Sequence, residues 1–570
     1  MTHDVTTDTN RRPNIFRDCM LALAFAVVTG DTALAQTTAP PASLGAGALV
    51  RGFVSAGSHA KQRWPLLTDV RRDLATLYDA SGDTLLWSHG GQPTPSALLV
   101  VQQLALLNAR GLDPADYDAA SLQQLAAAPV SSAQAQADFD VTLTTAALRA
   151  LRALRYGRVS ARIVHAQLGF DRETYDISGA VRAMTTATNP ALAFDQAEPP
   201  FLHYHLLKNA MARYRALARD TSLTSIVIAR TLKSGATDSG MPPLRRLLTA
   251  TGDLAAVAEQ GGADSFVYDS VTVAGVRRFQ LRQGFAGDGV IGPATLARLR
   301  RSFPARIAQM ELTLERWRWL PHDLGDPPPI IVNVPAFRLH AFTTSTDREA
   351  DLISMDVVVG DAFNHKTPVF SGALQYLVFS PYWDVPPSIT RKELLPKARR
   401  DGGYLARGNY EVVSNGGAVL GTAASAVAAV AAGRARIRQK PGATNSLGRV
   451  KFIFPNAFNV YLHDTPAQSV FERARRDASH GCIRVADPVR LARFLLADQA
   501  AWDSTAIVAA MSQLIPRQVN LTRRIPVHIV YATTVAREDG VVLFYDDIYG
   551  HDRTLSALLA KGYPYSDGGR

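Results

Sequence analysis

The chain has 570 residues, and 61 Lys and Arg against 50 Asp and Glu give it a formal net charge of +11. Its length predicts about three or four domains, and its 47% hydrophobic and 19% charged residues exclude a mainly disordered chain. The positive charge favours anionic partners such as a membrane surface or an anionic polymer. Because no block of Lys and Arg is interleaved with aromatic residues, we expect no nucleic-acid partner.

Residues 1–35 have the pattern of a signal peptide. Arginines precede a short apolar run that begins at Cys19, and Ala33-Leu34-Ala35 is a small-x-small cleavage site. The apolar run is too short for a comfortable membrane span, although an uncleaved anchor remains the alternative. We therefore expect an exported protein. Residues 36–60 are rich in Ala, Thr, Pro, Ser and Gly and are expected to be a flexible linker.

Three further segments are predicted to be helical. Residues 61–241 repeat apolar side chains every three or four positions and carry no catalytic constellation, so we expect a helical scaffold domain. Residues 242–302 place apolar helical faces on both sides of a Gly-rich turn at 287–292, which predicts a small three-helix module. Residues 303–326 are expected to be a linker helix, with two tryptophans that pack between domains.

From residue 327 the pattern changes to short, alternating β-branched segments, which predicts a mostly β domain over 327–515. A basic, partly Ala-rich insert at about 387–440 is expected to be a helical cap or lid. Its basic residues, taken singly, have the pattern of an ordinary solvated face. Residues 516–570 are expected to form a β-hairpin with an Asp-Gly turn that extends the main sheet. The predicted fold class is therefore multidomain α+β.

Cys482 is the one cysteine expected in the mature chain, because Cys19 lies in the predicted signal peptide. It stands in the run Ser479-His480-Gly481-Cys482. A lone thiol in an exported protein has no internal disulfide partner, which leaves a buried hydrophobe, a metal ligand or a nucleophile. The polar, glycine-bent surroundings, and His463 at the end of an upstream apolar run, favour a nucleophile.

We expect the fold to return Cys482 to the side of His463, which then takes the thiol proton. The backbone N–H groups of Gly481 and Cys482 would hold the oxyanion, with His480 as a further donor. A carbonyl next to His463 would have to fix its tautomer. Arg484 could hold a substrate carboxylate in a bidentate pair, or could pair instead with an internal carboxylate.

Other roles for these residues remain open. His463, His480 and Cys482 supply three zinc ligands, although the His-x-Cys spacing is unusual for zinc. Ser479 is a second candidate nucleophile, but no G-x-S-x-G elbow surrounds it. A structural role is the alternative for His480.

The spacing of His463, fifteen residues and then Ser479-His480-Gly481-Cys482-Ile483-Arg484 resembles the catalytic signature of the L,D-transpeptidases of YkuD type. Many members have Asn where Arg484 stands. The 242–302 module resembles the three-helix peptidoglycan-binding module. Four stretches and the domain order resemble the YcbB-like subgroup; the stretches are 316–321, 366–372, 381–389 and 445–452.

The resemblance implies a periplasmic enzyme that acts on peptidoglycan stem peptides without metal or organic cofactor. Cys482 would attack the carbonyl that follows an L-centre, and a diaminopimelate side-chain amine would resolve the thioester into a 3–3 or a 1–3 cross-link. Carbapenems would acylate the thiol, and glycan strands are candidate partners of residues 242–302. Beside the catalytic set, the expected substrate contacts are Arg484, Ser479, Tyr461 and Trp383.

Two functions from other classes stay open. In the first, water resolves the thioester, which makes the protein a cysteine-dependent peptidoglycan L,D-carboxypeptidase or endopeptidase. In the second, the protein only binds the wall through residues 242–302 and Cys482 has no role.

Overall fold

The computed structural model describes residues 44–82, 84–127, 131–166, 168, 174–223, 226–255, 265–344 and 347–565. The predicted signal peptide and cleavage site therefore lie outside the described residues. Within the described ranges, no helix is both long enough and apolar enough to cross a membrane.

The N-terminal part of the described chain is a helical domain built around one long helix, α5. Almost all of α5 is buried from Ala137 onwards, since helices pack on all sides of it. The helices of this part are α1 (Ala46–Ala56), α2 (Arg71–Ser81), α3 (Pro95–Ala105), α4 (Ala119–Ala127), α5 (Ala133–Tyr156), α6 (Ala161–Val164), α7 (Ile177–Met184), α8 (Ala191–Ala197) and α9 (Leu202–Leu217). The predicted helical scaffold is confirmed.

The expected flexible linker at 36–60 is wrong from residue 46 onwards. Residues 46–56 form α1, whose Val50 and Val54 are buried in the core of the scaffold against α5. The two valines are four positions apart and so face the same side of a helix. The small residues around them gave the segment a linker-like composition that hid this short apolar stripe.

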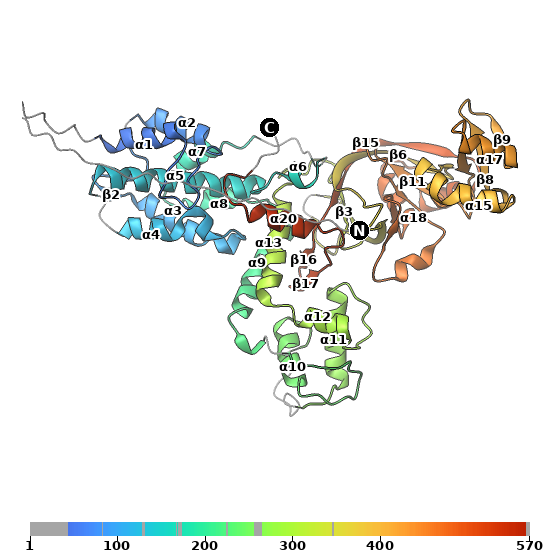
Figure 1. Ribbon diagram of the computed structural model, residues 1–570, viewed down its shortest axis with the longest axis horizontal. Coiled ribbons are helices and arrows are strands. Elements are labelled where there is room, and N and C mark those ends of the chain that lie inside the picture. The colour runs from blue at the N-terminus through green and yellow to red at the C-terminus, as the bar shows by residue number, and fades with distance from the viewer. Residues whose placement is uncertain are drawn as a thin grey trace, which may run out of the picture. The chain divides into compact units, whose positions relative to one another are not determined.

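Residues 241–299 form three helices joined by a closed turn; these helices are α10 (Met241–Ala250), α11 (Ser270–Arg282) and α12 (Pro293–Leu299) (Figure 1). Gln280 closes the turn from α11. Its amide nitrogen donates to Asp288 Oδ1 at 2.7 Å, and its amide oxygen accepts from the N–H of Gly289 at 2.8 Å. Gly289 has φ +75°, a backbone conformation that favours glycine. The predicted Gly-rich turn is therefore built by a side chain of the preceding helix.

Helix α13 (Phe303–Trp317) follows this module and contacts α9 and α20. Trp319, just after the helix, is buried, and its indole N–H donates to the carbonyl of Val159 in the scaffold at 2.9 Å. The expectation that a tryptophan of this segment packs between domains is thus confirmed for Trp319.

The β domain is a closed barrel with one extra strand. Its strands run in the order β13-β5-β14-β12-β11-β6-β15-β3-β4, and pairing of β4 with β5 closes the ring. Closure leaves few free edges, and side chains alternate between the filled interior and the outer surface. The bounds are β3 (Ile330–Asn333), β4 (Arg338–Ala341), β5 (Ile353–Gly360), β6 (Phe370–Phe379), β11 (Val450–Ile453), β12 (Leu462–His463), β13 (Asp477–Ser479), β14 (Ile483–Val485) and β15 (Arg517–Val530). Helices α18 (Pro488–Leu495) and α19 (Ser504–Ser512) pack on the same core.

The insert between β6 and β11 is a cap with its own small core, but it is not purely helical as expected. It carries a four-stranded antiparallel sheet in the order β7-β10-β8-β9, and its elements lie together in Figure 1. The alternation of apolar and basic residues in Ala435-Arg-Ile-Arg-Gln is typical of a strand and could have indicated this sheet. Its elements are β7 (Trp383–Asp384), α14 (Pro387–Ile389), a π-helical turn η4 (Thr390–Leu394), α15 (Leu395–Arg400), α16 (Tyr404–Arg407), β8 (Tyr410–Ser414), β9 (Val419–Gly421), α17 (Ala424–Ala431) and β10 (Ala435–Gln439).

The prediction for residues 516–570 is confirmed for an added strand and wrong for the hairpin. The barrel does gain a strand, β15, between β6 and β3. The hairpin with the Asp539-Gly540 turn does not extend that sheet: β16 (Thr534–Ala536) and β17 (Val542–Phe544) pair only with each other. Their apolar side chains, including Phe544, are buried in a core shared with α9, α11 and α13. Helix α20 (His551–Leu559) follows.

Candidate active site

The candidate catalytic residues lie on the outer face of the barrel where β12 and β14 run parallel. His463 is the register partner of Arg484, while Leu462 and Ile483 are partners that face the core. Because side chains alternate along a strand, Tyr461 and Cys482, two positions earlier, share the face of His463 and Arg484. On the next strand, β11, Lys451 is the register partner of His463. Strand pairing alone thus brings two cations, an imidazole and a thiol together.

A tight turn presents Cys482. Gly481 has φ +110°, and Ser479 lies beneath the turn with only 4% of its surface exposed. The Ser479 hydroxyl donates to the Cys482 carbonyl at 2.5 Å and accepts from the Gly481 N–H at 3.2 Å. The structure therefore revises the role expected for Ser479, because its hydroxyl holds the turn and does not face a substrate.

The Cys482 thiol is half-buried and donates to the carbonyl of Asn459 at 3.7 Å. Burial raises the pKa of the thiol, while hydrogen bonds from the backbone N–H and hydroxyl of Tyr461 and the charge of Arg484 oppose the rise. The resting group is therefore a thiol rather than a thiolate. Tyr461, expected as a substrate contact, lies beside the sulfur, and its ring is 5.8 Å from that of His463.

His463 is buried and held as a neutral base. Its Nδ1 lies 2.5 Å from the carbonyl oxygen of Asp464, and the ring also has a hydrogen bond with the backbone of Leu447. A carbonyl accepts only from a protonated nitrogen, so this contact places the proton of the neutral ring on Nδ1. Burial, with the charge of Arg484, lowers the pKa of His463 to about 3. The prediction that a neighbouring carbonyl fixes the tautomer is confirmed.

The side chain of Asp464 is used elsewhere. Its carboxylate accepts from the backbone N–H of Arg449 at 2.8 Å and from that of Thr465 at 2.7 Å. The approach is so close that a Cβ at Gly448 would lie 2.3 Å from Asp464 Oδ2. Asp464 therefore holds the loop that surrounds His463, and it orients the imidazole through its carbonyl.

Arg484 has no carboxylate partner among the residues that the structure describes. Its Nε is buried without a hydrogen-bond partner, and burial lowers the pKa of the guanidinium, an effect that the nearby Cys482 opposes. The alternative of an internal carboxylate partner therefore has no support in this geometry. The cation is instead left to stabilise a thiolate or a substrate carboxylate.

His480 and Trp383 lie toward the cap. His480 Nε2 is 2.7 Å from Glu393 Oε1 of the cap, and its ring is 4.6 Å from that of His365. His480 therefore contacts the cap rather than the position of an oxyanion donor. The ring of Trp383 lies 6.5 Å from that of Tyr410 within the cap. Across the described ranges, no three His, Cys, Asp or Glu side chains gather as metal ligands.

The comparison with protein families decides what kind of domain carries this face. Residues 327–522 match the model described as the L,D-transpeptidase catalytic domain, called YkuD. Residues 327–522 are an L,D-transpeptidase catalytic domain. The predicted family is thus confirmed for this part of the chain, and the four residues Tyr461, His463, Cys482 and Arg484 all fall inside it.

The rest of the chain matches two further models. Residues 72–211 match a model described as "Scaffold domain", and residues 244–299 match one described as "Putative peptidoglycan binding domain". A protein of Haemophilus influenzae named "Putative L,D-transpeptidase" is 32% identical over 228 residues. That segment covers 40% of this chain and 45% of the relative, so the chain spans less than half of that protein.

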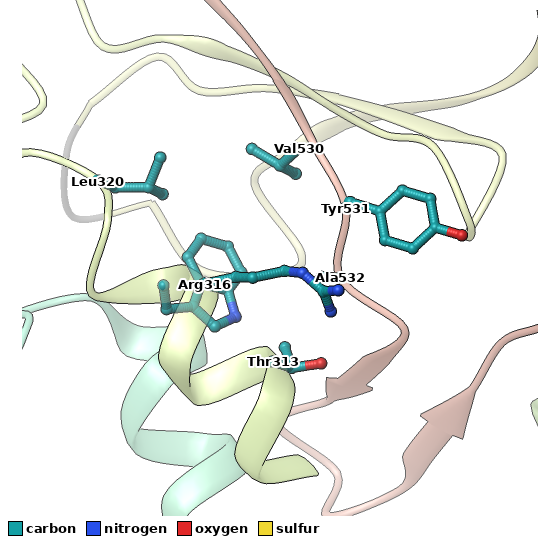
Figure 2. Close-up of a pocket in the computed structure, with 7 residues that line it drawn as sticks. Thr313, Arg316, Leu320, Val530, Tyr531 and Ala532 are labelled. Carbon is teal, nitrogen blue, oxygen red and sulfur yellow. The ribbon is translucent and has the colours of Figure 1, made fainter. Parts of the chain in front are cut away.

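The transpeptidase domain also contains site residues that sequence reasoning missed. Lys451 occupies the outer position of the alternating segment Val450-Lys-Phe-Ile, a signal that period-two counting could have used. Asn459 and Glu393 contact the site from loops and from the cap, and no local pattern indicates them. A small cavity of about 20 Å³, large enough for about one water, lies elsewhere, between α13 and the end of β15 (Figure 2). None of the predicted site residues lines it.

Proposed function

We propose that this chain is a peptidoglycan L,D-transpeptidase that uses Cys482 as its nucleophile. The observation that carries the proposal is the shared outer face of β12 and β14, which holds a half-buried thiol and an imidazole whose Nδ1 lies at the Asp464 carbonyl. The match of residues 327–522 to the catalytic-domain model supports the same function. A non-catalytic wall-binding protein has no need of this arrangement.

The first half-reaction forms a thioester. The thiol turns from Asn459 to His463, and Nε2 takes its proton as sulfur attacks the stem-peptide carbonyl. A bond forms between Sγ and the carbonyl carbon, and the carbonyl π electrons move to oxygen. When the oxyanion collapses, the C–N bond breaks and the departing amine of D-Ala takes the proton from His463. Because both groups are neutral at rest, the proton moves only when substrate is attacked.

The second half-reaction consumes the thioester. The side-chain amine of diaminopimelate on another stem attacks the carbonyl and gives a proton to His463. Collapse of this second intermediate breaks the C–S bond, and His463 returns the proton to sulfur. The product is a cross-link, 3–3 by the family resemblance and 1–3 as the variant. If water replaces the amine, the same steps make the enzyme a carboxypeptidase.

The charges around the thiol favour an acidic substrate. Arg484 and Lys451 share the face, and neither has an ion-pair partner among the described residues. Burial lowers the pKa of Lys451, while the charge of Asp384 opposes this. Unpaired half-buried cations are costly unless a ligand supplies the counter-charge. The carboxylates of a stem peptide are suitable counter-charges, and carbapenem inhibitors carry one too.

Location and glycan binding belong to the same proposal. The N-terminal pattern at 1–35 supports export to the periplasm, where peptidoglycan lies. The match of residues 244–299 to a peptidoglycan-binding model supports glycan strands as a further partner. Both are tested by fractionating cells and by co-sedimenting the protein with purified peptidoglycan sacculi.

The deciding experiment incubates the purified protein with disaccharide-tetrapeptide and detects the products by mass spectrometry. We expect dimers with loss of D-Ala, and tandem fragmentation then identifies the donor position. Trimmed monomers alone would establish the carboxypeptidase instead. Cys482→Ala should abolish both products, with Ser512→Ala, on the outer side of α19, as a matched surface control. Full activity in Cys482→Ala would overturn the thiol mechanism.

A further inference from the structure

A buried threonine outside the catalytic signature holds the nucleophile turn. Thr367, between β5 and β6, is 1% exposed. Its hydroxyl donates to the carbonyl of Gly481 at 2.8 Å and accepts from the N–H of Gly360 at 2.8 Å. One hydroxyl therefore joins the end of β5 to the residue just before the nucleophile.

The threonine is itself held from the C-terminal part of the chain. The hydroxyl of Tyr549 donates to the Gly360 carbonyl at 2.6 Å and accepts from the N–H of Thr367 at 3.1 Å. Lys366 donates to the Tyr549 carbonyl at 2.9 Å, and the Tyr549 N–H donates to the hydroxyl of Tyr531 at 2.9 Å. Because every bond lies in a closely packed region, this network leaves Thr367 little freedom to turn.

The position of the Gly481 carbonyl determines where the next N–H points. A trans peptide unit is planar, with its C=O and N–H in opposite directions. Since Thr367 binds the Gly481 carbonyl, the Cys482 N–H must point to the opposite side. In the described part of the chain that N–H has no acceptor, whereas the Gly481 N–H already meets the Ser479 hydroxyl. The Cys482 N–H is thus the donor left for an oxyanion.

We propose that Thr367 is a positioning residue, which aims the Cys482 N–H at the oxyanion by holding the Gly481 carbonyl. The inference rests on the proposed acyl transfer at Cys482 and adds to it the residue that orients the Cys482 N–H. Thr367 touches neither substrate nor sulfur. It acts by preventing the peptide unit between Gly481 and Cys482 from rotating when charge develops on the substrate oxygen.

Two reactions of the same thiol separate this role from a general structural one. Acylation by a carbapenem adds sulfur to a carbonyl: the S–C bond forms, the ring C–N bond breaks and the ring nitrogen takes the proton. That reaction passes through an oxyanion. Alkylation by iodoacetamide displaces iodide and forms no oxyanion. Thr367→Val keeps the shape of the side chain but loses the hydroxyl. It should slow acylation roughly 10- to 100-fold and change alkylation by less than about three-fold.

Matched variants complete the test. Thr367→Ser keeps the hydroxyl and should restore acylation to within about three-fold of wild type. Thr251→Val removes another buried threonine hydroxyl, in the 241–299 module, and should change neither reaction. If Thr367→Val does not fold, Tyr549→Phe carries the same comparison, with acylation again slowed and alkylation unchanged. Equal losses in both reactions, or unchanged acylation, would overturn the positioning role. Wild-type protein that is alkylated but never acylated would contradict the proposed function instead.

Discussion

Buried charges are paired at the junction between the scaffold and α13. On the outer face of β12 and β14, called the catalytic face below, they have no carboxylate partner among the described residues. At the junction, Glu315 is fully buried, accepts from the backbone N–H of Val159 at 3.0 Å, and lies 3.5 Å from both Arg158 and Arg318. Opposite charges from the scaffold and from α13 thus neutralise each other. At the catalytic face, Arg484 and His463 lie together without a carboxylate partner in the described structure.

The difference indicates what each region is for. A closed charge network stabilises one arrangement of domains, and removing one partner leaves the others uncompensated. An open set of ionisable groups adds little stability but keeps their shifted pKa values available to a substrate. Mutations at the two regions should therefore separate stability from reactivity.

The largest expected effect is that of His463→Ala on the reactivity of Cys482. Replacement by alanine (His463→Ala) removes the base, so carbapenem acylation should fall by about 10²- to 10⁴-fold. The folded protein should persist, since the lost side chain is neutral when buried. Intact-protein mass spectrometry over time measures the rate. Acylation within a few-fold of wild type would contradict His463 as the base.

At the junction, Glu315→Gln should act on stability alone. It leaves the buried Arg318 guanidinium without its carboxylate and leaves Arg158 only the more distant Asp116, at 3.8 Å, so the free energy of unfolding in urea should fall by about 3–5 kcal/mol. The rate of Cys482 alkylation in the folded protein should not change. Glu538→Gln breaks an exposed ion pair with Arg348 and serves as the control. Its urea unfolding midpoint should change little, because exposed ion pairs add little stability. Equal midpoints for the two variants would show that the network contributes nothing.

Acid should destabilise the protein partly through His463. The folded pKa of about 3 lies below the unfolded value of roughly 6.5. Below pH 6.5 the unfolded chain gains a proton that the folded chain does not, so stability falls as pH decreases toward 3. Between pH 6.5 and 4.5 this residue should cost about 2–3 kcal/mol. Urea midpoints across this range should fall less steeply in His463→Ala, and parallel slopes would exclude the effect.

The smallest effect is expected at Arg484. Its charge lowers the pKa of both Cys482 and His463. Arg484→Ala should therefore raise both pKa values and slow alkylation at pH 7 by roughly ten-fold. The pH profile of iodoacetamide labelling should move to higher pH. Arg490→Ala, on α18, is the control, and an unmoved profile for Arg484→Ala would exclude the electrostatic role.

Sequence reasoning reached the parts of the site that are local in the chain. The run Ser479-His480-Gly481-Cys482 indicates a bent, polar turn. The alternation of the segment that ends at His463 is visible in the sequence and indicates a strand that carries a candidate base. It did not reach Thr367 or the hidden helix α1. Thr367 lies 114 positions from its partner Gly481. The apolar stripe of α1 is short, and its role became evident only from its packing against α5.

The sequence by itself determined the division into helical and β parts, the family of residues 327–522, and the polar, glycine-bent turn around the lone thiol. These depend on composition, on period and on short motifs, which are properties of neighbours in the chain. Only the tertiary structure decided that the barrel closes, that His480 contacts the cap, that Ser479 lies beneath the turn, and that a buried threonine binds the Gly481 carbonyl. Each of these depends on hydrogen bonds between distant segments, whose partners are chosen by packing and not by spacing along the chain.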